Sequence, residues 1–67
     1  MEFDAFDWME ISGKRVAIIR VLRPFSPYSL LNYEVKIDGK KFKIIDVKRY
    51  DEVAKDTDEI GLMVESI

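Results

Sequence analysis

The 67-residue chain contains no cysteine and no histidine. Without cysteine no disulfide can stabilise it, and without either residue the usual ligands of a zinc site are missing. A serine nucleophile would also lack its ordinary base. We therefore expect no metal site, no cofactor and no catalytic residue, and we expect a binding protein in preference to an enzyme.

The sequence also lacks a long uncharged segment. The longest one, residues 24–33, contains two prolines and three polar residues, so it does not suit a membrane-spanning helix. The first ten residues carry four acids, where a signal peptide carries basic residues. We expect a soluble, cytoplasmic protein that makes no membrane contact.

Amide side chains are scarce. Glutamine is absent, asparagine and threonine occur once each, and 36% of the residues are charged. This composition is typical of proteins from hyperthermophiles, although a short chain can also reach it by chance. The length allows one small domain, residues 1–67, whose stability must come from dense packing, ion pairs or association.

An eleven-residue segment occurs twice, at residues 13–23 and 39–49, with six identical residues. Each copy starts with Gly-Lys between stretches of alternating apolar residues, which predicts two β-hairpins. We expect four-residue loops at residues 12–15 and 38–41, so that apolar side chains face each other across each pair. The expected partners are Ile11 with Val16, Met9 with Ile18, Ile37 with Phe42, and Val35 with Ile44.

In both copies the alternation of apolar residues changes phase at an Ile-Ile pair, at residues 18–19 and 44–45. A β-bulge or sharp bend at each pair would return the following apolar residues to the core. Strands that bend at equivalent points allow a small sheet to close into a barrel. The alternative is that these strands are buried on both faces.

The remaining segments complete the predicted fold. Residues 58–66 predict a last strand, in which Ile60, Leu62 and Val64 face the core. Residues 27–32 and 51–56 are expected to be connectors, with one helical turn at Val53 and Ala54 in the second. Residues 1–8 are expected to form an irregular strand or a helical turn. The prediction is an all-β, single-domain fold, a small closed or nearly closed barrel of five or six strands built from two similar hairpin units.

Charge is distributed unevenly along the chain, which has a net charge of −2. Residues 1–11 sum to −4, residues 12–49 to +7 and residues 50–67 to −5. The basic middle either contacts nucleic acid or is neutralised by acidic ends that fold back on it.

Two groups of residues form the candidate nucleic-acid site. One is a proline-stiffened loop whose aromatic residues can stack on bases, and the other is the polar face of the second hairpin, whose lysines can bind phosphates. The alternatives are that Phe25 and Tyr28 cap the core and that the lysines belong to a mixed charged surface. The candidate residues are Arg23, Phe25, Tyr28, Lys36, Lys41 and Lys43.

The N-terminal aromatics Phe3, Phe6 and Trp8 offer a second hypothesis. They either plug one end of the core or form an association surface. In the second case the chain would be a protein–protein interaction module or a homodimeric structural domain. RNA or ribonucleoprotein is the expected partner under the first hypothesis.

The last 27 residues, 41–67, resemble the end of the second-domain β-barrel of translation elongation factors. Residues 44–47, Ile-Ile-Asp-Val, match its bent strand, and residues 60–62, Ile-Gly-Leu, match its closing strand. The glycine-rich earlier strands of that family are not visible here. The resemblance implies a barrel fold, a place near RNA or ribonucleoprotein, and no nucleotide hydrolysis by this chain.

Overall fold

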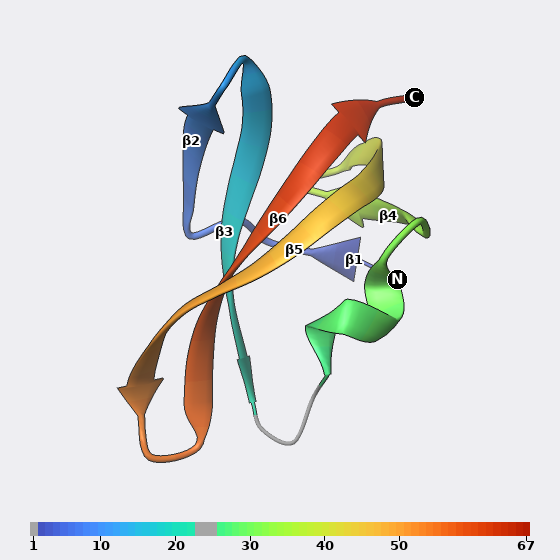
Figure 1. Cartoon of the computed structure of the whole chain (residues 1–67). Coiled ribbons are helices and arrows are strands. Elements are labelled where there is room, and N and C mark those ends of the chain that lie inside the picture. Colours follow the sequence, from blue (N-terminus) through green and yellow to red (C-terminus); the bar gives the residue numbers. More distant parts are fainter. Residues whose placement is uncertain (1, 23–25) are drawn as a thin grey trace.

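The computed structural model describes residues 2–22 and 26–67, which form one six-stranded sheet (Figure 1). The sheet order is β1-β4-β5-β6-β3-β2, and every neighbouring pair is antiparallel except β1 with β4. The predicted all-β class and the last strand are confirmed. Within the described residues no helix is long and apolar enough to cross a membrane. The elements are β1 (Glu2–Phe3), β2 (Asp7–Ile11), β3 (Lys14–Leu22), the 3-10 helix η1 (Pro27–Leu30), β4 (Glu34–Ile37), β5 (Lys40–Ala54) and β6 (Thr57–Ser66).

Both predicted hairpins form, and each closes through a two-residue turn in the left-handed region. Ser12 and Gly13 have φ of 51° and 78°, and Asp38 and Gly39 have φ of 53° and 83°. Two successive positive φ values define a type I′ turn, whose twist matches that of the flanking strands. The repeated Gly-Lys sequence therefore reflects a shared turn geometry.

The strand register differs from the predicted one because the turns are two residues long and not four. In the second hairpin Ile37 faces Lys40 and Val35 faces Phe42. The slip of two residues keeps every apolar side chain on its predicted face, since side chains alternate with a period of two. The first hairpin slips in the same way, with Ile11 opposite Lys14 and Met9 opposite Val16. Its expected core face is wrong, however, because Met9 and Ile11 are exposed and β3 contributes Ala17 and Ile19 to the main core.

The predicted β-bulge occurs in only one of the two repeats. The β5–β6 register shifts between Ile44 and Asp46, so Ile45 is the extra residue. In contrast, β3 pairs with β6 without a shift from Arg15 to Leu22, and the predicted β-bulge at Ile18-Ile19 is wrong. There the strand is buried on both faces instead, at Val16, Ala17, Ile18 and Ile19.

The single bulge explains why equivalent residues of the two repeats lie on opposite faces of the sheet. Ile44 belongs to the main core cluster, whereas its counterpart Ile18 is buried on the opposite face of the sheet. The extra residue Ile45 restores the phase, so that Val47 and its counterpart Val21 both pack on the core. The two units therefore share their turns but not their buried faces.

The main core lies on the inner face of the curled sheet. At one end of it Trp8 packs against Phe42 with ring centroids 5.5 Å apart. The guanidinium of Arg15 lies 4.5 Å from the Trp8 ring centroid and 5.2 Å from that of Phe42, so it covers this end. The cluster consists of Ala17, Ile19, Leu30, Val35, Ile37, Phe42, Ile44, Val47, Ile60, Leu62 and Val64.

The sheet is not closed by hydrogen bonds, which corrects the expectation of a closed barrel. The edge strands β1 and β2 are not paired with each other in the described structure. They are consecutive in the chain, however, and four steps from Phe3 to Asp7 span at most about 14 Å. Residues 4–6 therefore carry the chain from one edge of the sheet to the other (Figure 1).

Asp38, in the β4–β5 turn, holds this N-terminal segment in place. Its carboxylate accepts hydrogen bonds from Ala5 N at 2.9 Å and from Trp8 Nε1 at 3.0 Å. Its own N–H donates to Phe3 O at 3.0 Å. These bonds link the turn to the segment that joins β1 and β2.

The hydrogen bonds at Asp38 predict a pH-dependent contribution to stability. The bond from Ala5 N, and then that from Trp8 Nε1, hold the pKa of the Asp38 carboxyl below its ordinary value. Because the pKa is lowered in the folded state, the stabilisation is present above about pH 4 and is lost as the pH falls through the folded value. We expect Asp38→Asn to lower Tm at neutral pH, with the difference from wild type shrinking in acid. Asp4→Asn removes a carboxylate from the same region and is the control; an equal and parallel loss in both variants would contradict this role.

The second predicted connector is wrong. Residues 51–54 continue β5, which pairs with β6 as far as Ala54, and no helical turn forms at Val53 and Ala54. Two further register shifts follow along β5, and the N–H of Glu52 is satisfied there by Asp51 Oδ1 at 2.8 Å. The first connector contains η1, whose Leu30 is buried in the core.

Candidate nucleic-acid interface

The outer face of the β4–β5 hairpin carries the three candidate lysines. Lys36 lies directly opposite Lys41, and Lys43 lies opposite Glu34. The alternate residues Val35 and Phe42 point into the core. The sequence pattern thus predicted correctly which side of this hairpin is polar.

Three basic residues elsewhere in the sheet, Lys14, Arg20 and Lys48, lie in ion pairs. The acidic strand β6 lies between β3 and β5, and it brings Glu65 to within 3.5 Å of Lys14 and Glu59 to within 3.5 Å of Arg20. Lys48 lies 3.8 Å from Asp46 on its own strand. The acidic C-terminal segment therefore does fold back on part of the basic middle.

The three hairpin lysines differ from these ion-paired residues because no carboxylate of the described residues lies close to them. Within residues 2–22 and 26–67, no carboxylate lies within 4.0 Å of the ammonium group of Lys36, Lys41 or Lys43. All three are exposed. An exposed cation without a counter-ion in the protein is available to an anionic ligand at little desolvation cost.

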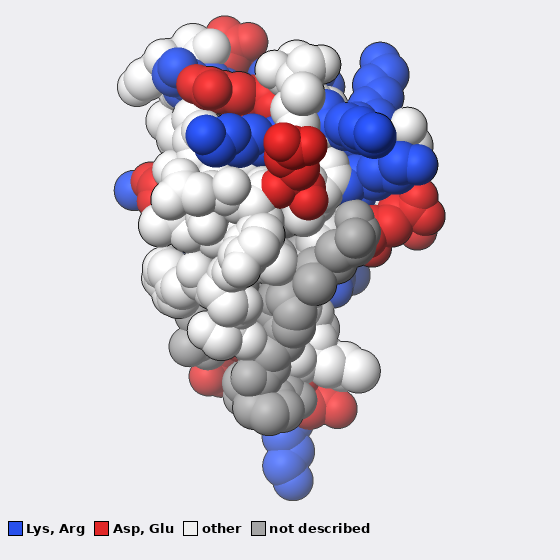
Figure 2. Space-filling model, turned by 90° about the vertical axis from the view of Figure 1, so that its right-hand side faces the viewer, with Lys and Arg blue, Asp and Glu red and all other residues white. Residues whose placement is uncertain are grey.

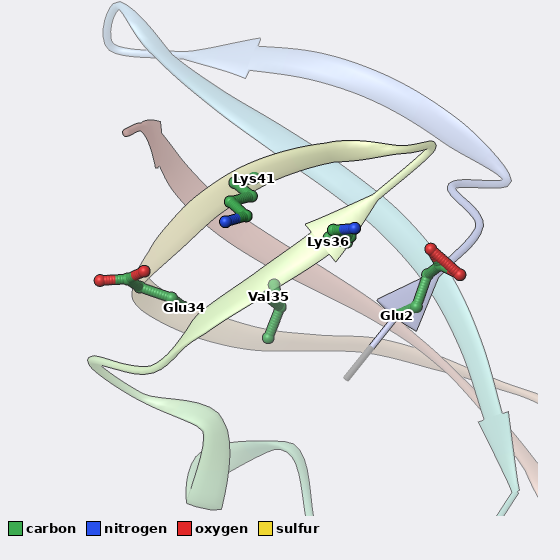
Figure 3. Close-up of a pocket in the computed structure, with 5 residues that line it drawn as sticks. All are labelled: Glu2, Glu34, Val35, Lys36 and Lys41. Carbon is green, nitrogen blue, oxygen red and sulfur yellow. The ribbon is translucent and has the colours of Figure 1, made fainter.

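Two of these lysines line a shallow hollow of about 520 Å³ (Figure 3). In the view of Figure 3, Lys36 from β4 and Lys41 from β5 lie between Glu34 at one end and Glu2 at the other. Val35 is the fifth residue that lines this hollow. The centre of the hollow is therefore cationic and its two ends are acidic.

A second hollow, of about 390 Å³, shares Glu34 and Val35 with the first. Its other lining residues are Ser29, Leu30 and Tyr33. This volume lies in the lower part of the range of small-molecule sites, about 300–1,000 Å³. The two hollows adjoin at Glu34 and Val35, with Lys36 and Lys41 in the first and Tyr33 in the second.

Tyr33 is the residue of this surface that sequence reasoning missed. Its side chain is 64% exposed, yet its backbone is fixed by two hydrogen bonds, from its own N–H to Leu30 O and from Ile44 N to its carbonyl. An exposed ring on a fixed backbone is suited to stacking at low entropic cost. The available signal in the sequence was an aromatic residue directly after Asn32 and before the strand Glu34–Ile37.

The proline-containing loop is only partly covered by the structure. Arg23 and Phe25 lie outside the described residues. Tyr28, on η1, is 61% exposed, so the alternative in which it caps the core is wrong, and Leu30 covers the core there instead. Tyr28, Leu31 and Tyr33 leave exposed apolar surface on and after η1.

The three N-terminal aromatics do not form one surface. Phe3 and Trp8 are partly buried against the core, whereas Phe6 is 59% exposed. The Phe6 ring lies under the guanidinium of Arg20, with 3.8 Å between Cζ and the ring centroid. Of these three rings, only that of Phe6 is therefore mainly exposed.

Figure 2 shows the side of the molecule that lies to the right in Figure 1, where β1, β4 and η1 are found. Lys and Arg gather near the top of this face with Asp and Glu among them, and a broad uncharged area adjoins them below. The surface is therefore mixed in charge and has a cationic part next to an uncharged one.

This arrangement offers cations, stacking faces and a few carboxylates. In the part of the chain that the structure describes, no three acidic side chains gather into a group that could hold a metal ion. Comparison of the chain with protein-family models, with curated proteins and with solved structures gives no match.

Proposed function

We propose that the chain is a non-catalytic binding module for single-stranded RNA, and that the β4–β5 hairpin and η1 form its contact surface. The observation that carries this proposal is that Lys36, Lys41 and Lys43 share one face of the hairpin and have no counter-ion within 4.0 Å among the described residues, whereas Lys14, Arg20 and Lys48 lie in ion pairs. The surface extends over two adjoining hollows that share one wall. Tyr33 lines the smaller hollow, Tyr28 lies on the preceding helix η1, and both are exposed.

The lysines would bind the phosphates. A lysine that neutralises a phosphate releases a condensed counter-ion, and this release supplies most of the sequence-independent affinity. Lys36 and Lys41 face each other across the hairpin, with Lys43 two residues further along β5. Such a row suits a backbone that runs along the hairpin.

The tyrosines would bind the bases. Each base stacked on an aromatic ring contributes about 1–3 kcal/mol, and stacking requires bases that are not already stacked in a helix. Tyr33 lines the smaller hollow and Tyr28 lies on the adjacent helix η1. This geometry favours single strands over duplexes.

The proposal also includes a nearly closed barrel as the scaffold. Residues 4–6 link the two edge strands, and Asp38 holds them through its bonds to Ala5 and Trp8. The near closure and the resemblance to translation elongation factor barrels both suit a small domain that works next to RNA. A rigid scaffold keeps the lysines and Tyr33 in fixed positions.

A second candidate function is association with another protein through the outer face of β2. Met9 and Ile11 are 44% and 36% exposed there, on a strand at the edge of the sheet, and Phe6 lies just before it. Phe6, Met9 and Ile11 line neither hollow, so the two functions are separable by mutation.

Fluorescence anisotropy with a labelled 12-nucleotide single strand and a matching duplex tests the proposal. We expect the single strand to bind more tightly and Tyr33→Ala to weaken it about tenfold, which is the lower part of the range for stacking on an exposed ring. Phe6→Ala removes a ring of similar exposure elsewhere and is the matched control. Equal losses in both variants, or equal binding of duplex and single strand, would contradict the proposal.

A further inference from the structure

Glu34 is the residue that the proposed contact with phosphates leaves unexplained. It lines both hollows, and a carboxylate beside a phosphate path repels the backbone. Although Lys43 lies opposite Glu34 in the register, no cation lies within 4.0 Å of the Glu34 carboxylate among the described residues. The carboxylate is therefore free to accept hydrogen bonds from a ligand.

The smaller hollow has the composition of a site for one flat ring. Leu30 and Val35 are each 4% exposed and form apolar walls, and Tyr33 supplies an aromatic face. The hydroxyl of Ser29 donates its hydrogen to Ser26 O at 2.8 Å, so only its lone pairs remain for a ligand. Together with the carboxylate of Glu34, this hydroxyl offers acceptors to whatever enters.

Acceptors of this kind discriminate among the four bases. Guanine alone presents two neighbouring donors, N1–H and the N2 amino group, which match the two oxygens of one carboxylate. Adenine and cytosine present one amino group next to a ring nitrogen acceptor, and uracil presents one N–H between two carbonyls. A carboxylate would therefore repel an acceptor on each of these three bases.

The geometry points to a guanine-binding pocket at Tyr33 and Glu34, in which the base stacks on the ring and its Watson–Crick edge bonds to the carboxylate. The inference rests on the proposed function, since the lysines would hold the strand that delivers the base. The chain would then prefer single strands that contain guanine, while phosphate contact supplies affinity for any sequence.

Titration with uridine-rich 8-nucleotide strands that carry one central guanine, inosine, adenine or cytosine tests this inference. Inosine lacks only the N2 amino group, so one charge-assisted hydrogen bond is lost. We expect the guanine strand to bind about tenfold more tightly than the inosine strand, and the adenine and cytosine strands to bind no better than inosine.

Glu34→Gln separates the base contact from the rest of the surface. An amide presents one donor and one acceptor, so we expect the preference for guanine over inosine to disappear while binding of the all-uridine strand is kept or strengthened. Glu2→Gln is the matched control, because Glu2 lines only the hollow with the lysines, and it should keep the preference. Equal binding of all four strands that weakens with salt would overturn the guanine pocket alone, whereas no binding of any strand at low salt would overturn the proposed function.

Discussion

The Ile60→Ala variant is expected to lose about 2–5 kcal/mol of the free energy of unfolding. Ile60 is 1% exposed, belongs to the main core cluster and lies opposite Ile19 at the centre of the sheet. Truncation of the side chain would leave a cavity in the core beneath β6, which is held in place by β5 on one side and β3 on the other. Small domains have a total stability of about 5–15 kcal/mol, so this loss is a large part of the whole.

Urea unfolding, followed by the fluorescence of the single tryptophan Trp8, measures this loss. Ile67→Ala is the matched control, because it makes the same chemical change at a side chain that is 65% exposed. We expect it to change the stability by no more than about 0.5 kcal/mol. Equal unfolding midpoints for the two variants would show that the described core is wrong.

Replacement of Lys36, Lys41 and Lys43 by Gln is expected to remove most of the RNA affinity. Three phosphate contacts to a single strand give a salt slope of about −2, so wild-type affinity should fall about 20-fold between 50 and 200 mM salt. The triple variant should bind at least tenfold more weakly at low salt and should lose most of the slope. Anisotropy titrations at four salt concentrations measure both quantities.

The matched control for net charge is the triple replacement of Lys14, Lys48 and Lys55 by Gln. It removes the same charge, but Lys14 and Lys48 are already in ion pairs, and Lys55 lies in the β5–β6 turn. We expect this variant to keep nearly all of its affinity and its slope. If both triple variants lose affinity equally, the binding depends on overall charge and the hairpin surface is not the site.

The strands, and the buried faces of the second hairpin and of the last strand, were predictable from local pattern, whereas the expected core face of the first hairpin was wrong. The Gly-Lys turns identified both hairpins, and the alternation around Ile60 identified the last strand and its buried side. Alternation also placed Lys36 and Lys41 on the outer face, since each is directly adjacent in the chain to an apolar residue that faces the core. These features depend on residues that are close in sequence, so they survive a slip of two residues in register.

Features that depend on distant residues were not predictable. The bulge is one such feature, because it is defined by the register of β5 on β6, whereas β3 pairs with β6 without a shift. Locally the two copies differ in the preceding residue, which is Ala17 before Ile18 and Lys43 before Ile44. The role of Asp38 depends on Ala5, which is 33 residues away in the sequence. The pairing of lysines with acids also depends on where β6 inserts, so the sequence could not show which lysines remain without a partner.

The most direct test of the central claim is an NMR titration of ¹⁵N-labelled protein with an 8-nucleotide single-stranded RNA at 50 and 150 mM salt. We predict amide shifts confined to residues 28–36 and 41–43, which weaken at the higher salt. Shifts confined to β2 and to residues around Phe6, or no shifts at 50 mM salt, would contradict the claim that the unpaired hairpin lysines and Tyr33 form an RNA-binding surface.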